Sequence, residues 1–210
     1  MVESIQPDYT CDVKFKDDPD LWQSILEGER DAFELLFQKY FDDLFHYALK
    51  LTGQRSIAED HVQGLFLYIW QKRGTLKEVM AVKTYLWAAL RRRIIDSYRK
   101  KKTERKYLNT YHDDNLSMQL SSEELIINDE QATIRSKKLK KAIEQLSSRE
   151  CEVLYLKFYE GMNYQEIEQI MSVNYQTCRN YTYRAIEFLR KTLHTEVLAS
   201  IILAGLLSML

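Results

Sequence analysis

Apolar residues recur every three or four positions along most of the chain, which is the pattern of amphipathic α-helices. The clearest run extends from Phe33 to Leu51 and predicts a long helix that ends at Gly53. Similar runs predict further helices near residues 20–28, 56–73 and 79–102, and again from residue 134 onwards. No alternating run of β-branched residues bounded by turn residues is present. The pattern therefore predicts an all-α fold.

A change of composition divides the expected helices into two groups. Residues 107–133 mix acidic side chains with Ser, Asn and Gln, and apolar positions are sparse there. Such a segment cannot bury enough apolar surface to fold alone, so we expect a flexible acidic linker between two small helical domains. The expected parts are a flexible N-terminal arm (1–19), a first domain (20–106), the linker (107–133), a second domain (134–196) and an apolar C-terminal tail (197–210).

The second domain has the spacing of a helix-turn-helix. Ser147 stands three residues before Glu150, and Asn163 stands three before Glu166, which is the capping-box arrangement of a helix start. A helix of about eight residues, a break of about three and a longer helix is the spacing of a DNA-binding helix-turn-helix. The helix after Ser147 is expected to bury Val153, Leu154, Leu156 and Phe158.

The last expected helix has two different faces. Its inward face is expected to consist of Cys178, Thr182, Ala185, Ile186 and Leu189. Its outward face would present Gln176, Arg179, Asn180, Tyr183, Arg184 and Glu187. Arg suits guanine edges or phosphate, and Gln and Asn suit adenine edges or phosphate. A solvated helix face would show the same pattern, so spacing alone leaves both interpretations open.

The charge distribution adds a second candidate surface. The net charge of −1 is uninformative, but residues 91–106 hold nine basic side chains. Tyr98 lies within this block, and Tyr85 and Trp87 precede it. Aromatic rings beside positive charge suit single-stranded nucleic acid, because bases can stack and phosphates can pair. The alternative is a solvated basic helix end, which the helix dipole also favours.

Other chemistries find no support in the sequence. Cys11, Cys151 and Cys178 show no paired spacing, and the four histidines are scattered. We therefore expect no metal site, no cofactor, no catalytic site and no small-molecule substrate. Reduced thiols and the lack of a signal-peptide pattern favour a cytoplasmic protein. The uncharged tail 197–210 is short for a membrane span. It either folds onto one of the domains or docks on a partner or membrane face.

Four stretches together resemble the extracytoplasmic-function (ECF) class of bacterial sigma factors. They are "GERDAFELLFQKYFDDLFHYA", "SIAEDHVQGLFLYIW", "VKTYLWAALRRRIIDSYRKKK" and "LSSRECEVLYLKFYEGMNYQEIEQIMSVNYQTCRNYTYRAIEFLRK". The first three are similar to sigma region 2 and the last is similar to region 4, in the family's order. The resemblance implies a specificity subunit of RNA polymerase that melts promoter DNA and is not an enzyme.

The resemblance also assigns roles to individual residues. Residues that would contact or shape the polymerase-binding surface are Asp60, Gln63, Phe66 and Trp70. Residues that would line the path of the opened −10 strand are Arg91, Arg92, Arg93, Asp96, Tyr98 and Arg99. Residues that would face the −35 duplex are Tyr175, Gln176, Thr177, Arg179, Asn180, Tyr183 and Arg184.

The chain departs from the family pattern at several of these positions. Arg92 stands where members often carry Asn, and Arg179-Asn180-Tyr181 replaces a frequent Lys-Ser-Arg triplet. Ser172 replaces a frequent turn glycine, and Ser147 a frequent proline. We expect these differences to alter the promoter sequence rather than the fold.

The partners implied by the resemblance are core RNA polymerase, promoter DNA and an anti-sigma factor, either soluble or membrane-anchored. The acidic linker would either thread the polymerase interior or act as a flexible tether. Two other classes share parts of the pattern. A stand-alone helix-turn-helix regulator would bind duplex DNA unaided as a dimer. A helical interaction protein would keep the apolar stripes without needing the basic-aromatic helix.

Overall fold

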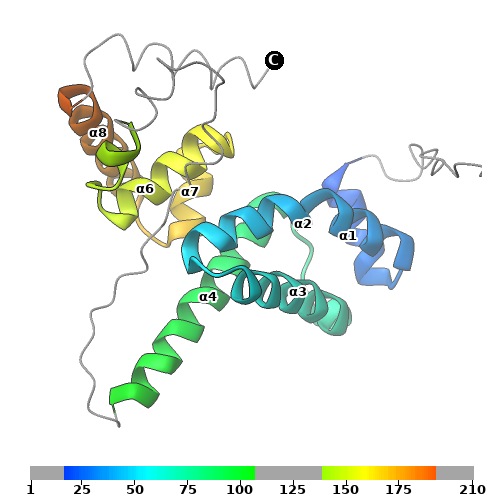
Figure 1. Cartoon of the computed structure of the whole chain (residues 1–210). Helices are drawn as coiled ribbons and strands as arrows, with labels where there is room; N and C mark the ends of the chain where they lie inside the picture. The colour runs from blue at the N-terminus through cyan, green and yellow to red at the C-terminus, as the bar shows by residue number, and fades with distance from the viewer. Residues whose placement is uncertain (1–16, 107–138, 193–210) are drawn as a thin grey trace, which may run out of the picture.

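The first domain is a group of four helices. The computed structural model describes residues 17–106 and 139–192, and the expected arm, linker and apolar tail lie wholly or mostly outside them. The helices are α1 (Asp18–Glu27), α2 (Arg30–Thr52), α3 (Arg55–Lys72) and α4 (Val82–Lys106), with a short 3-10 turn, η1 (Arg73–Thr75), after α3. Helix α2 packs against α1, α3 and α4, and the basic end of α4 extends away from the group (Figure 1).

Local sequence signals explain where these helices begin and end. The side chain of Asp17 accepts a hydrogen bond from the Asp20 backbone N–H at the start of α1. Gly28 and Gly53 end α1 and α2 with φ values of 97° and 65°, in the left-handed region that glycine adopts without a steric penalty. The predicted end of the second helix at Gly53 is thereby confirmed.

The second domain is a compact helix-turn-helix unit. Residues 139–143 are helical, and they are followed by α6 (Ser148–Leu154), a π-helical segment η3 (Tyr155–Tyr159), α7 (Tyr164–Met171) and α8 (Tyr175–Thr192). Capping boxes start α6 at Ser147 and α7 at Asn163, as the sequence predicts. Within the described residues all regular structure is helical, so the all-α prediction is confirmed there.

The π-helical segment corrects one part of the predicted core. The Glu160 N–H donates to the Tyr155 carbonyl at 3.1 Å, an i to i+5 bond that rotates the following side chains relative to an α-helix. Phe158, expected to be buried, is therefore 48% exposed, and Tyr155 is buried instead. The inward prediction for Val153 and Leu156 is confirmed, whereas Leu154 is half-buried.

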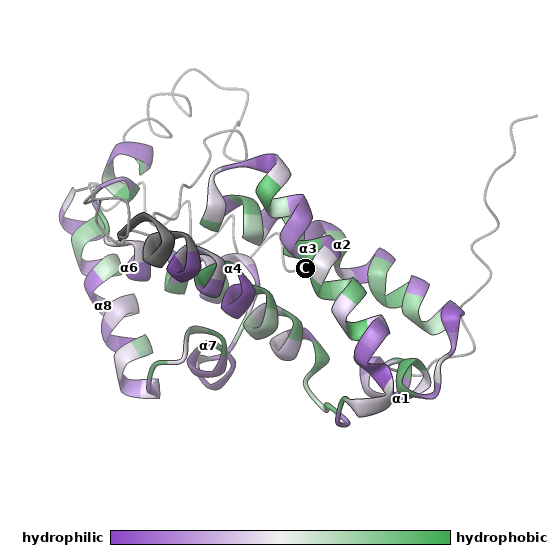
Figure 2. Cartoon of the chain, turned by 90° about the horizontal axis from the view of Figure 1, so that it is seen from below, coloured by the Kyte–Doolittle hydropathy of each residue, from purple (hydrophilic) through white to green (hydrophobic). Residues whose placement is uncertain are grey.

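The two domains lie directly against each other. Helix α7 packs along α4 (Figure 1), and the Tyr47 hydroxyl of α2 donates a hydrogen bond to Glu152 of α6. Buried apolar residues of both domains, including Tyr47 and Leu90 of the first and Leu156 and Met171 of the second, belong to one continuous cluster. The hydropathy colouring in Figure 2 shows polar and apolar residues alternating along the helices. Among the described helices, none is both long and apolar enough to cross a membrane.

Candidate nucleic-acid and polymerase interfaces

Helix α8 presents an exposed polar face on a firmly seated helix. Its opposite side is buried at Cys178, Thr182, Ala185 and Leu189, whereas Ile186 is half-buried. The outward residues predicted from spacing are exposed at Gln176, Arg179, Asn180, Tyr183 and Arg184. Tyr183 is 68% exposed, so its ring is accessible on this face. The predicted division of α8 into two faces is confirmed, although Glu187 and Thr177 are half-buried.

The start of α8 is fixed by polar contacts. Asn174 accepts a hydrogen bond from the Thr177 backbone N–H at 2.8 Å, so it caps the helix. Ser172, in the turn before it, has a φ of 53°, the left-handed conformation that glycine adopts more easily. The Tyr175 ring meets the Tyr164 ring edge-on at 5.7 Å. These contacts hold α8 on the rest of the helix-turn-helix.

Two side chains on the α8 surface are already oriented by each other. The Gln176 side-chain amide donates to the Asn180 side-chain oxygen at 3.1 Å, one helical turn further on. Tyr181 lies between the faces and packs against the apolar core, half-buried. The polar face is therefore made of Gln, Asn and Arg groups suited to base edges and phosphates, without Tyr181.

The basic end of α4 forms a second polar surface. Arg92, Asp96 and Arg99 lie four and three residues apart on one exposed face, and the Arg99 guanidinium lies 3.7 Å from the Asp96 carboxylate. The Tyr98 hydroxyl donates to the Thr52 carbonyl at 3.4 Å, and its ring remains 38% exposed. The basic and aromatic groups expected for an opened DNA strand are thus accessible at these positions.

Arg93 takes a different direction and approaches helix α3. Its guanidinium occupies the space that a β-carbon on Gly64 would fill. The absence of a side chain at residue 64 therefore allows Arg93 to lie close to the α3 backbone while remaining exposed. This pairing of two helices was not visible in the sequence.

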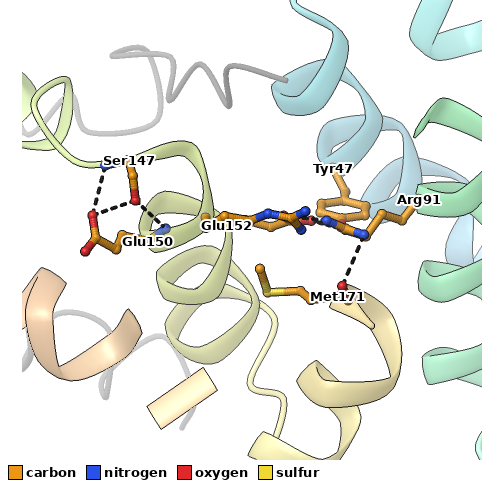
Figure 3. Close-up of polar contacts among 7 residues, drawn as sticks. Tyr47, Arg91, Ser147, Glu150, Glu152 and Met171 are labelled. Carbon is orange, nitrogen blue, oxygen red and sulfur yellow. Dashed lines mark hydrogen bonds and ion pairs between the residues drawn. The ribbon is translucent and has the colours of Figure 1, made fainter. Parts of the chain in front are cut away.

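Arg91 does not share the exposure of its neighbours. It is 4% exposed, and its guanidinium forms two hydrogen bonds to the Glu152 carboxylate, at 2.6 and 3.1 Å (Figure 3). A third contact, at 3.4 Å, runs to the Met171 carbonyl. Burial lowers the pKa of Arg91, but the hydrogen bonds and charge of Glu152 outweigh this and leave the pKa raised. In this arrangement Arg91 is unavailable to DNA.

Trp87 also differs from its expected role. It is fully buried, and Tyr85 is half-buried with its ring 5.0 Å from that of Trp22. Trp87 therefore offers no free plane to a base, so the expectation that it continues the aromatic surface of the basic block is wrong in this arrangement, whereas Tyr85 is only partly covered. They lie on the apolar stripe of α4, and tertiary packing takes precedence there.

Helix α3 presents the residues assigned to polymerase binding in two layers. Asp60 and Gln63 are exposed, Trp70 is half-buried, and Phe66 is buried beneath them. The Trp70 and Phe66 rings pack on Phe33 of α2 at 5.0 and 6.1 Å. Phe66 can thus shape this surface but cannot touch a partner directly.

Sequence reasoning missed two exposed apolar residues on the same helix. Leu67 is 56% exposed and Tyr68 is 44% exposed. Leu67 follows Asp60 by seven residues and therefore lies on the same face, two turns along. Both are apolar residues outside the buried face of α3, which consists of Ala58, Val62, Leu65, Phe66 and Ile69, and that mismatch was the available signal. Two adjacent exposed apolar side chains beside Asp60 and Gln63 suit contact with a protein partner.

Comparisons with known proteins agree with this architecture. The model of Sigma-70 region 2 matches residues 36–104, and the model of Sigma-70, region 4 matches residues 136–189, together more than half of the chain. The ECF RNA polymerase sigma factor SigX of Bacillus subtilis (strain 168) is 25% identical over 172 residues, covering 80% of this chain and 86% of the relative.

Two solved structures share the fold. The sigma factor RpoE of Bartonella quintana, solved with the anti-sigma factor NepR, gives a TM-score of 0.58 at 21% identity, covering 78% of this chain and 97% of that one. CnrH, solved with the cytosolic domain of CnrY, gives 0.57 at 16% identity, covering 84% and 96%. Together with the helix-turn-helix and the order of the matched regions, these findings identify the family. The chain belongs to the ECF sigma factors, the non-enzymatic subunits that direct bacterial RNA polymerase to promoters.

Proposed function

We propose that the three exposed surfaces divide the work of promoter recognition. The α8 face of Tyr175, Gln176, Thr177, Arg179, Asn180, Tyr183 and Arg184 reads the −35 duplex. The α4 residues Arg92, Arg93, Asp96, Tyr98 and Arg99, joined by Arg91 once it is released, line the opened −10 strand. The α3 surface of Asp60, Gln63, Phe66 and Trp70 holds core polymerase, extended by the exposed Leu67 and Tyr68. The boundaries of the working parts are those expected from the sequence, 20–106 and 134–196.

The observation that carries the proposal is the two-faced character of α8. Its apolar side is buried, its polar side is exposed, and it follows a capped turn as the second helix of a helix-turn-helix. This is the geometry that places a helix in the major groove, with phosphate contacts setting its register. The departures at Asn180 and Tyr181 leave Arg179 and Arg184 as the basic groups of the central part of this face.

The proposed mechanism joins two weak sites on one platform. A single helix-turn-helix makes few contacts, so DNA binding by the free chain should be weak. On the polymerase both surfaces act at high effective concentration. Capture of unstacked bases beside α4 then offsets an unpairing cost of a few kcal/mol per base.

The site of action and the regulator follow from the same proposal. The chain acts in the cytoplasm, where polymerase and promoter DNA are found. An anti-sigma factor restrains it, which is supported by the solved complexes of RpoE with NepR and of CnrH with CnrY.

The experiment compares DNA retention with and without core polymerase. We expect specific retention of promoter fragments only when chain and polymerase are both present, and loss of retention in a Leu67→Asp variant. The matched control is Gln23→Asp, an exposed position on α1 outside the three proposed surfaces. Specific retention by the chain alone, as a dimer, would instead favour a stand-alone helix-turn-helix regulator. Failure to bind polymerase would contradict the proposal.

A further inference from the structure

The contact between the domains centres on a buried ion pair. Glu152 of α6 is 2% exposed and receives Arg91 of α4 through both of its carboxylate oxygens. The Tyr47 hydroxyl of α2 donates to the same carboxylate at 2.8 Å. Figure 3 shows the three side chains pointing toward one another between the helices. Burial and the charge of Glu152 raise the pKa of Tyr47, so its hydroxyl stays protonated and continues to donate.

Further contacts across the boundary surround this pair. The Tyr155 ring stacks on the Tyr47 ring at 5.9 Å. The Lys83 ammonium lies 3.2 Å from the Glu160 carboxylate and donates to the Glu160 carbonyl at 3.0 Å. Basic groups of the first domain therefore pair with acidic groups of the second at two separate places, Arg91 with Glu152 and Lys83 with Glu160. Both pairs lie beside the apolar cluster that the two domains share.

This arrangement cannot read both promoter elements at once. The Met171 carbonyl contacts Arg91 at 3.4 Å, and α8 begins four residues later. Four residues span at most about 14 Å, and the 18 residues of α8 add about 27 Å. All of α8 thus lies within about 45 Å of Arg91. Elements near −35 and −10 are about 25 base pairs apart, or about 85 Å along B-DNA.

We propose that this is a closed, self-inhibited form of the free chain, in which the Glu152 carboxylate occupies Arg91 in place of a DNA phosphate. The inhibitory role of this form rests on the proposed function, but the closed form itself can be tested without it. Carboxylate and phosphate both accept paired hydrogen bonds from a guanidinium, so one can substitute for the other. Core polymerase must separate the domains before Arg91 can meet the −10 strand. The inhibition requires no second protein.

A buried ion pair is compatible with a closure that core polymerase can reverse. Taking two charges out of water opposes the attraction between them, so a buried pair adds specificity more than stability. Removing one partner is different, because the remaining charge is left buried and unpaired. Loss of the Glu152 charge should therefore open the domains strongly. Loss of Lys83 should open them less, because Lys83 is half-exposed and Glu160 keeps the hydrogen bond from Tyr155.

The test measures the distance between the domains in the free, full-length chain. Spin labels at exposed Gln38 of α2 and Gln169 of α7 report it, in a Cys11→Ser background that leaves the buried Cys151 and Cys178 unlabelled. We expect one narrow distance for the wild type. Glu152→Gln should shift the ratio of open to closed chains by at least about tenfold, and Lys83→Met by up to about fivefold. Glu144→Gln, the same change at an exposed glutamate, should shift nothing.

A second measurement separates this inference from the proposed function. The apparent affinity for core polymerase should rise in the same ratio as the open fraction, since only open chains bind. A broad wild-type distance distribution, or unchanged narrow distances in both variants, would overturn the closed form. Opening without any polymerase binding would leave the closed form standing and refute the proposed function instead.

Discussion

The guanidinium of Arg93 lies against the backbone of Gly64, where any β-carbon on residue 64 would displace it. Gly64→Ala should therefore leave the fold intact and move Arg93. Alanine in a helix is about 1 kcal/mol more favourable than glycine, so thermal stability should be equal or slightly higher. Opening of the −10 region, measured by fluorescence of a 2-aminopurine base in the promoter, should fall severalfold.

The matched control for this change is Gly74→Ala, because a β-carbon at residue 74 would meet nothing within 4 Å. It should leave promoter opening at the wild-type level. Equal opening by Gly64→Ala and the wild type would show that the position of Arg93 does not matter to melting.

The backbone conformation at Ser172 favours glycine over serine. Its φ of 53° places a residue with a β-carbon in the left-handed region, at a cost of about 1 kcal/mol. Ser172→Gly should raise the free energy of unfolding by about 0.5–1 kcal/mol, measured with urea. The converse change, Gly161→Ser at φ 69°, should lower it by a similar amount. A loss of stability in Ser172→Gly would mean that the serine side chain contributes more than the turn strain removes.

Arg179 should contribute affinity for the −35 element without contributing to polymerase binding. Arg179→Ala should weaken use of the −35 element about tenfold and reduce the slope of log affinity against log salt by about one. Arg190→Ala, another exposed arginine in the last turn of α8, is the control and should have a smaller effect on the −35 element. If polymerase binding and promoter use fall together in Arg179→Ala, the residue has a structural role.

Glu160 should make the stability of the wild type depend on pH. Its burial raises its pKa above the ordinary value of 4.5, although Lys83 and Tyr155 act in the opposite direction. At pH values between 4.5 and the raised pKa, Glu160 is protonated in the folded chain but ionised in the unfolded chain. The contribution of Glu160 to the free energy of unfolding is therefore complete below about pH 4.5. It is lost as the pH rises through the raised pKa.

Glu160→Gln removes this titration and provides the comparison. Relative to it, the wild type should lose stability as the pH rises from 4.5 toward neutrality, measured as urea midpoints at a series of pH values. Parallel curves for the two proteins would show that Glu160 titrates at its ordinary value in the fold.

Features that depend on residues close together in the sequence could be predicted from it. The caps at Ser147 and Asn163 act over three residues, and the two faces of α8 follow from helical periodicity, so each was predicted and is confirmed. The exposure of Phe158 was not predicted, because a π-helical turn changes the period without any marker in the composition.

Contacts between distant segments escaped the sequence for a different reason. Arg91 and Glu152 are 61 residues apart, and nothing in either segment indicates that they meet. Arg91 was assigned to DNA with its neighbours because a basic run looks uniform in sequence. Its position on the face of α4 that turns toward α7 separates it from Arg92 and Arg93.

The most direct test of the account is transcription from a randomised promoter library by core polymerase and this chain, with start sites mapped by sequencing. We expect start sites that share two elements, near −35 and −10, with Arg179→Ala changing the upstream element and Arg92→Ala the downstream one. Start sites that are absent, or that do not differ from those of core polymerase alone, would contradict it.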